Sequence, residues 1–274
     1  MTFSIVARAG DAYGVAVASR FIAVGSVVPS ARVGVGAVAT QAMAKMSYAT
    51  DGLALLARGA TATDTVAGLT SPGEGREDRQ LGVVAAADQS TFTGRDCMDW
   101  AGGRWRGDKD SGYAIQPNIL VGERVDLDME RAWLENTDLR LAARLMRALV
   151  AGDHAGGDKR GRQSAALYAV APGAGYDHCG VLADLRVDDH RVATDELARL
   201  LDLHDLCLSS PGTVLPLEGP LADEVRQHLI TLGRTQPDLH DALQDWAGEA
   251  NFEMRMTADG IDSRVLQALR EAIA

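Results

Sequence analysis

Short apolar runs broken by turn residues fill much of the chain. Residues 2–8 and 14–20 are two such runs, and a glycine-containing link of hairpin length joins them. This pattern predicts an antiparallel pair of strands. Further strands are predicted at residues 33–41, 80–86, 90–93, 113–121, 163–171 and 181–187.

Apolar residues at helical spacing predict helices between these strands. The helices cover residues 48–58, 63–69, 126–150 (as one helix or a pair) and 194–204. Strand blocks separated by helices favour two packed sheets with helices on their outer faces. A doubly wound sheet would instead show a strict alternation of strand and helix. The predicted fold class is therefore α+β.

A linker is predicted at residues 208–212, where serine, proline and glycine gather. Residues 1–208 would form the larger domain. Residues 213–274 would form a small helical domain, with helices beginning near Pro220, Pro237 and Asp262.

The chain of 274 residues has 46% hydrophobic residues and a net charge of −11. The negative charge argues against nucleic-acid binding, because phosphates would be repelled. No apolar stretch reaches transmembrane length and the first residues lack a signal-peptide pattern, so we expect no membrane partner and a cytoplasmic location. The 3 cysteines are widely spaced and odd in number, which fits reduced thiols better than disulfides.

Thr2 is the strongest candidate for chemistry, because it follows Met1 directly and begins the first predicted strand. Threonine at this position permits removal of Met1, which would leave a hydroxyl and a free α-amine on one residue. An α-amine has a pKa of roughly 7.7–8. It could therefore take the proton while Oγ attacks a carbonyl. The alternative is that Thr2 is merely the second residue of the chain.

A glycine-rich and cationic loop at residues 156–164 is the sharpest local signal. Its glycines let the backbone approach a ligand, and its charge favours an anion. Gln163 and Ser164 then enter a buried strand, which predicts that both lie near Thr2 at the open edge between the two sheets. At least one arginine of the loop is expected to face that cleft. The alternative is a solvated loop. The cations are Lys159, Arg160 and Arg162.

Three other patterns are weaker. Residues 34–39 match the G-x-G-x-x-A dinucleotide pattern, but no helix begins at the second glycine and no acidic residue follows at the required distance. The aspartates and histidines of residues 178–190 fit no standard metal spacing. Cys97 has no base nearby in the sequence and is interpreted as a small buried residue. We therefore expect neither a cofactor nor a metal.

Five segments carry a family resemblance: residues 2–8, 14–19, 34–41, 157–166 and 185–189. Together they resemble a bacterial family of unknown function, domain of unknown function 1028, which is placed among the N-terminal-nucleophile (Ntn) hydrolases. The resemblance covers residues 2–207 and implies a four-layer αββα sandwich like that of proteasome β subunits. In such folds the nucleophile is the first residue of the first strand, which is Thr2 here.

Two further features concern this resemblance. Proteasome-like sites hold a lysine near the nucleophile, whereas the nearest candidates here are Arg20 or Arg8, with Lys45 beyond. The tail around Trp246 resembles a small helical module, labelled as peptidoglycan-binding, that some members append.

We interpret the chain as an N-terminal-threonine amidohydrolase that acts on a small amide or peptide-like substrate. The alternative is an inactive Ntn-fold protein that binds a ligand or serves as a scaffold, and a homo-oligomer is expected in either case. Backbone N–H groups or Asn118 would stabilise the oxyanion, and Arg160 or Arg162 would hold a substrate carboxylate. The candidate site residues are Thr2, Asn118 and Ser164 for catalysis and Arg20, Gln41, Asp158, Arg160, Arg162 and Gln163 for substrate binding.

Overall fold

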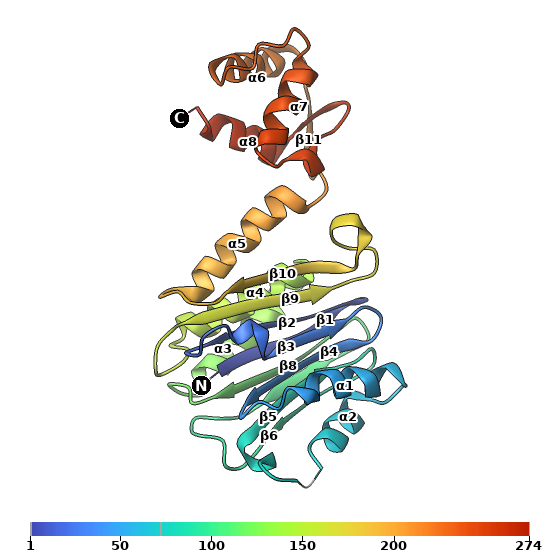
Figure 1. Ribbon diagram of the computed structural model, residues 1–274, viewed down its shortest axis with the longest axis vertical. Helices are drawn as coiled ribbons and strands as arrows, with labels where there is room; N and C mark the ends of the chain where they lie inside the picture. The colour runs from blue at the N-terminus through green and yellow to red at the C-terminus, as the bar shows by residue number, and fades with distance from the viewer. Residues whose placement is uncertain (1, 72, 274) are drawn as a thin grey trace. The chain divides into compact units, whose positions relative to one another are not determined.

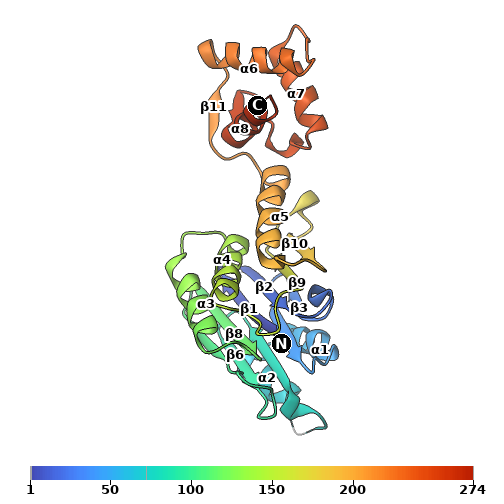
Figure 2. The same ribbon diagram turned by 90° about the vertical axis from the view of Figure 1, so that its left-hand side faces the viewer.

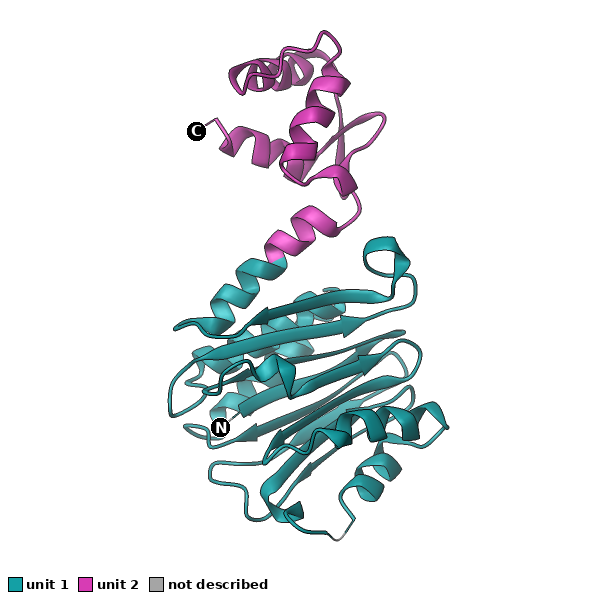
Figure 3. Cartoon of the chain, viewed as in Figure 1, with its two compact units in different colours: residues 1–201 teal, residues 202–274 magenta. Residues whose placement is uncertain are grey.

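The computed structural model describes residues 2–71 and 73–273. Met1, whose removal the sequence predicts, lies outside these residues. The chain divides into two compact units, residues 1–201 and 202–274, shown in teal and magenta in Figure 3. Within the described residues, no helix combines the length and apolar character needed to cross a membrane.

Unit 1 contains two antiparallel sheets (Figure 1). The larger has 6 strands in the order β10-β9-β2-β1-β8-β7, and the smaller has 4 in the order β3-β4-β5-β6. The strands of the larger sheet are β1 (Thr2–Ala9), β2 (Ala12–Ser19), β7 (Arg104–Gly107), β8 (Ser111–Asn118), β9 (Ser164–Val170) and β10 (Val181–Val187). Those of the smaller sheet are β3 (Pro29–Arg32), β4 (Gly36–Ala42), β5 (Arg79–Val84) and β6 (Gln89–Thr93).

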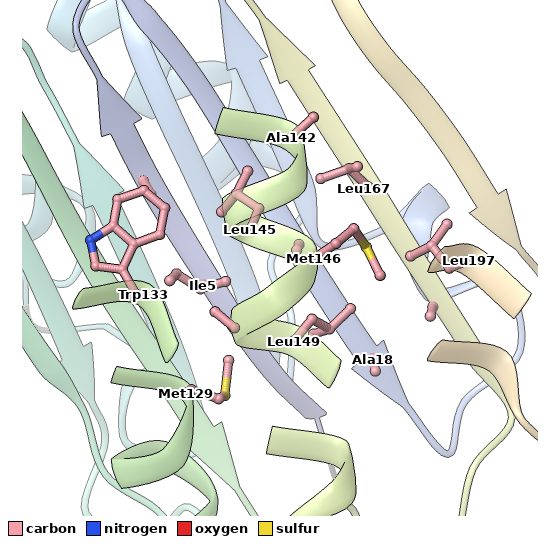
Figure 4. Close-up of a cluster of buried hydrophobic side chains, with 14 of the residues drawn as sticks. Ile5, Ala18, Met129, Trp133, Ala142, Leu145, Met146, Leu149, Leu167 and Leu197 are labelled. Atoms are coloured by element: carbon pink, nitrogen blue, oxygen red, sulfur yellow. The ribbon is translucent and has the colours of Figure 1, made fainter. Parts of the chain in front are cut away.

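The two faces of the larger sheet are buried against different partners. Along β1, Phe3 and Ile5 belong to a buried cluster with side chains of α3 (Arg124–Glu135) and α4 (Leu141–His154). Figure 4 shows Leu145 and Leu149 of this cluster lying over the strands. Val6 instead joins a second cluster, which lies between the two sheets. Alternate residues of one strand thus supply two separate cores, as the two-residue period of a strand requires.

A third cluster covers the smaller sheet. Val38 of β4 and Leu81 of β5 pack with Tyr48 and Leu56 of α1 (Ser47–Ala57) and with Val66 of α2 (Ala62–Leu69). Figure 2 shows α3 and α4 on the side of unit 1 away from α1. Unit 1 is thus a mixed α+β structure in which helices bury the faces of antiparallel sheets.

Unit 2 has its own small core, in which Leu229, Leu243 and Val265 are buried together. The boundary between the units falls within α5 (Ala193–Leu208). Arg255 and Asp262 of this unit form a buried ion pair of 3.1 Å. The other elements of unit 2 are β11 (Val214–Pro216), α6 (Gly219–Thr231), α7 (Leu239–Glu249), β12 (Gly260–Asp262) and α8 (Ser263–Glu271). Short 3-10 helices occur at Val24–Ser26 (η1), Arg76–Asp78 (η2), Tyr176–His178 (η3) and Glu253–Arg255 (η4).

The structure differs from the sequence-based expectation mainly in short strands. The strands β3 and β7 were not predicted, and each is an edge strand of 4 residues. An edge strand pairs on one side only, so it does not need the apolar alternation that marks a buried strand. The run predicted at residues 33–41 begins as a strand at Gly36, because a turn occupies residues 33–35 with Gly34 at φ +69°. The strand predicted at 113–121 ends at Asn118.

Candidate active site

A cavity of about 710 Å³ opens at one end of the space between the two sheets. Thr2, Ser19, Gln41 and Asn118 form its polar floor. These residues stand at the start of β1 and at the ends of β2, β4 and β8. In antiparallel sheets such positions fall at the same end, so the topology gathers residues that are far apart in the sequence.

Strand register places four polar residues in one row across the larger sheet. Thr2 lies opposite Asn118 on one side and Ser19 on the other, and Ser19 lies opposite Ser164. Directly opposed residues project from the same face of a sheet. Thr2 Oγ1 lies 3.0 Å from Ser19 Oγ, within hydrogen-bond distance. The Thr2 residue is only 8% exposed, yet it borders the cavity.

The orientation of Asn118 is determined by Gln80 of the smaller sheet. Gln80 Nε2 donates to the backbone oxygens of Gly102 and Pro117, at 3.0 and 2.7 Å. Because these carbonyls can only accept, the Gln80 amide must turn its nitrogen toward them. Its Oε1 therefore accepts from Asn118 Nδ2 at 2.7 Å and from Gln41 Nε2 at 2.9 Å. Asn118 thus directs its nitrogen, rather than its oxygen, toward Gln80.

Gln41 connects β1 to the smaller sheet. Its Nε2 donates to Thr2 O at 3.3 Å and to Gln116 O at 2.7 Å, and its Oε1 accepts from Ser4 Oγ at 2.7 Å. Gly82 makes room for this arrangement, since a Cβ there would lie 2.2 Å from the Gln116 amide. We call Ser4, Gln41, Gln80, Gln116 and Asn118 the buried amide network.

Ser164 holds one wall of the cavity rather than its floor. Its Oγ accepts from Val24 N at 3.0 Å and donates to Phe21 O. This clamp fixes the segment between β2 and β3, from which Phe21, Val24, Val27 and Val28 line the cavity. Ser164 itself is buried and is not part of the lining.

Arg160 is the predicted loop cation that lines the cavity. Its guanidinium lies 3.2 Å from Asp158, whose carboxylate also accepts from the backbone nitrogens of Arg160 and Arg20, each at 2.8 Å. Asp158 therefore shapes the loop from beneath. Among the described residues of the lining, Arg79 is the other cation, and the lining also includes Asp78 and Asp96.

Three residues predicted to bind substrate, Arg162, Gln163 and Arg20, do not line the cavity. Arg162 binds the buried carboxylate of Asp153 at 2.7 Å. Gln163 donates to the exposed Asp189 at 3.1 Å, and Arg20 donates to Arg162 O at 3.0 Å. These side chains serve loop structure and do not line the cavity.

Arg8 and Lys45, which the sequence offers as candidates for the lysine of proteasome-like sites, both lie outside the cavity lining. Arg8 lies at the far end of β1 and binds carbonyls of the turns there. Lys45 Nζ lies over the Tyr48 ring, 5.1 Å from its centroid. Among the described residues that line the cavity, none is a lysine.

Cys97 borders the same cavity but is poorly suited to nucleophilic attack. Burial raises the pKa of its thiol, and the negative charges of Asp78, Asp96 and Glu77 add to this effect. The thiol remains protonated at neutral pH, and a thiolate is the form that attacks.

Backbone strain gathers around the cavity. Ala42 and Ile119 both line it, and both adopt left-handed conformations with φ of +65° and +51°. A β-branched residue such as Ile119 rarely adopts this conformation. Such strain persists only where surrounding contacts enforce it, and it is common at functional sites.

Residues 2–197 match the model of a family of unknown function, DUF1028. The chain belongs to this family. It is similar to protein SPO2555 from Silicibacter pomeroyi, whose crystal structure carries the same family description. That match has 28% identity and a TM-score of 0.64, and it covers 82% of this chain and 94% of the other. Residues 208–269 match a model described as "Putative peptidoglycan binding domain". No curated protein gives a significant match.

The DUF1028 description assigns no activity, so function must be argued from the site. Sequence reasoning missed Ser19 and the members Ser4, Gln80 and Gln116 of the buried amide network. A signal for them exists: each is a buried polar residue within three residues of one end of its strand. The same feature recurs in several strands, and together these residues mark one end of the space between the sheets.

Proposed function

We propose that unit 1 is a four-layer αββα sandwich of the Ntn type and that Thr2 is its nucleophile, in an N-terminal-threonine amidohydrolase. Helices on the outer faces of two packed sheets support the fold assignment. The observation that carries the function is the hydroxyl of Thr2, the first residue of β1, on the floor of a cavity of about 710 Å³. This volume suits a small-molecule ligand.

The reaction requires a free α-amine on Thr2. Thr2 Oγ1 attacks the carbonyl carbon of the amide, and its proton passes to the amine. Collapse of the tetrahedral intermediate breaks the C–N bond while the α-ammonium returns the proton to the leaving amine. The acyl group then remains on Thr2 as an ester. Water attacks this ester with the α-amine as base, releases a carboxylic acid and restores the hydroxyl.

Neighbouring residues supply the remaining roles. Ser19 Oγ, 3.0 Å from Thr2 Oγ1, orients the nucleophile. Asn118 Nδ2 donates one N–H to Gln80, and its second N–H is our candidate donor to the oxyanion. Arg160, at the cavity wall, is the candidate partner for a substrate carboxylate.

A ligand-binding protein without catalysis is the competing function. The observation that favours it is the lining itself, whose described cations are Arg79 and Arg160, with no lysine beside Thr2. Such a protein would use the same cavity and would not need a free amine on Thr2.

Two measurements distinguish these functions. Intact mass and N-terminal sequencing of protein with a native amino terminus should show a chain that begins at Thr2. An acylating probe such as a β-lactone should then modify Thr2 and should fail to label Thr2→Ala. A chain that retains Met1, or a probe that labels Thr2→Ala equally, would contradict the hydrolase.

For unit 2 we propose peptidoglycan binding, following the description of its matching model. A cavity of about 200 Å³ lies between α6 and α7 and is bordered by Arg226, Arg234 and Gln236. These polar groups suit the amides and hydroxyls of a glycopeptide. Sedimentation of the full chain with purified cell-wall sacculi tests this proposal, and Gln236→Ala should reduce the bound fraction. Equal sedimentation of both proteins would contradict a role for this cavity.

A further inference from the structure

One wall of the cavity beside Thr2 is apolar throughout. It is formed by Phe21, Val24, Val27 and Val28, which we call the apolar wall. Val24 and Val28 are buried within the cluster between the sheets, whereas Phe21 is 50% exposed. Half of the Phe21 surface is thus exposed beside a polar floor, and burial of this surface by an apolar group would be favourable.

Two methionines from other segments extend this apolar surface. Met43 follows β4 and Met98 follows β6, and both line the cavity while remaining 68% and 66% exposed. Large apolar side chains gathered at one opening mark a binding site more strongly than single ones scattered over a surface. Methionine also adapts its shape to varied apolar partners.

Backbone hydrogen bonds hold the segment that carries the apolar wall. The Ser164 hydroxyl holds both Phe21 O and Val24 N. Ala23 N donates to Asp188 O at 3.0 Å, and Val28 N donates to Val24 O at 3.1 Å. A surface held in this way loses little conformational freedom on binding, so contact with it contributes more fully to affinity.

We propose that the substrate is an amide with a bulky apolar acyl group, which packs on the apolar wall. This inference rests on the proposed function. In that reaction the acyl group stays bonded to Thr2 Oγ1 through the second step, whereas the amine departs after the first. The partner that must be held through both steps is the acyl group, and the apolar wall lies beside the hydroxyl that carries it.

Binding is measured separately from hydrolysis. Thr2→Ala, which cannot form the ester, is titrated calorimetrically with N-octanoylglycine and N-acetylglycine, which differ only in acyl length. The octanoyl compound should bind at least about 10-fold more tightly, because each buried CH₂ group contributes about 0.8 kcal/mol. Equal affinities would overturn the inference, whether or not either amide is hydrolysed.

Wall variants in the Thr2→Ala background locate the acyl site. Val27→Asp should weaken octanoyl binding at least about 10-fold, because the acyl chain would meet a charge. Phe21→Ala should weaken it several-fold, and Ile22→Ala is the matched control, since Ile22 is a neighbouring exposed residue outside the lining. If Ile22→Ala weakens binding as much as Phe21→Ala, the apolar wall is not the acyl site.

Hydrolysis by the unsubstituted protein then tests the proposed function on its own. Cleavage of N-acetylglycine as efficient as that of N-octanoylglycine would leave the hydrolase standing and overturn the acyl preference. Selective binding of N-octanoylglycine without cleavage of either amide would support the apolar site and contradict the hydrolase.

Discussion

The two ends of β1 both bury polar residues on the face toward the smaller sheet, but they do so in different ways. At one end Arg8 is 4% exposed, and its guanidinium donates to the carbonyls of Gly10, Asp108 and Lys109 at 2.9–3.2 Å. At the other end Thr2 shares a hydrogen bond with Ser19 and then faces a cavity.

The difference separates a structural use of a buried polar group from the chemical use that we propose for Thr2. The Arg8 guanidinium donates its hydrogen bonds to the carbonyls of turns at the end of the sheet. A ligand could bind Arg8 only by breaking these hydrogen bonds. The Thr2 hydroxyl is held by one neighbour and has open space beside it. Buried polarity alone therefore does not mark a site, whereas buried polarity that borders a cavity does.

The largest effect is expected at the Thr2 end. Thr2→Ala should lower kcat/KM by more than about 10³-fold, because removal of a nucleophile abolishes the covalent step. The free energy of unfolding, measured with urea, should fall by only about 1 kcal/mol, which is the net contribution of one hydrogen bond. Ser19→Ala is the matched control, since it removes the same hydrogen bond and keeps the nucleophile. A Thr2→Ala protein that retains activity would place the chemistry elsewhere.

At the Arg8 end we expect the opposite result, a large effect on stability and a small effect on activity. Arg8→Met keeps an apolar stem but leaves three buried or partly buried carbonyls without their donor. We expect a loss of about 2–4 kcal/mol in the free energy of unfolding, measured with urea, and less than a two-fold change in kcat/KM. A ten-fold fall in kcat/KM at unchanged stability would remove the contrast between the two ends.

Gln80 lies between these cases, because it is structural in position but orients Asn118, our candidate donor to the oxyanion. Gln80→Leu frees the Asn118 amide from its acceptor, so kcat should fall about 10–100-fold with little change in KM. The control is Thr93→Val, which removes one acceptor of Gln80 Nε2 and leaves the bond to Asn118 in place. If both variants lower kcat equally, general loosening of the buried amide network explains the effect.

The smallest effect is expected at Cys97. Cys97→Ser should change kcat/KM by less than about two-fold, because burial raises the pKa of the thiol and keeps it protonated at neutral pH. Iodoacetamide should alkylate the exposed Cys179 faster than Cys97, as measured by peptide mass spectrometry. Rapid alkylation of Cys97 with loss of activity would make it a rival nucleophile.

The sequence predicts the elements of unit 1 better than their contacts. Apolar periodicity locates β1, β2 and the helix pairs, since those elements bury regular faces. It misses β3 and β7, edge strands whose pairing depends on the neighbouring strand rather than on their own pattern.

The candidate site shows the same division between local and distant information. Thr2 can be proposed from its position, and Arg160 from its loop. The roles of Gln80 and Ser19 depend on strand register, which brings residues from separate sheets or strands together. Arg162 illustrates the limit: its charge suggests a ligand, but the buried Asp153 of α4 binds it. Nothing in the spacing of these two residues reveals that pairing.

The Ser164 clamp has a consequence for biosynthesis. The hydroxyl that holds Phe21 and Val24 is on the first residue of β9, so a segment synthesised early is fixed by a residue synthesised much later. A nascent chain therefore exposes its threonine long before it possesses a pocket. The cavity wall can therefore be fixed only after β9 has been synthesised, and a fragment that stops before this strand lacks the hydroxyl that holds Phe21 and Val24.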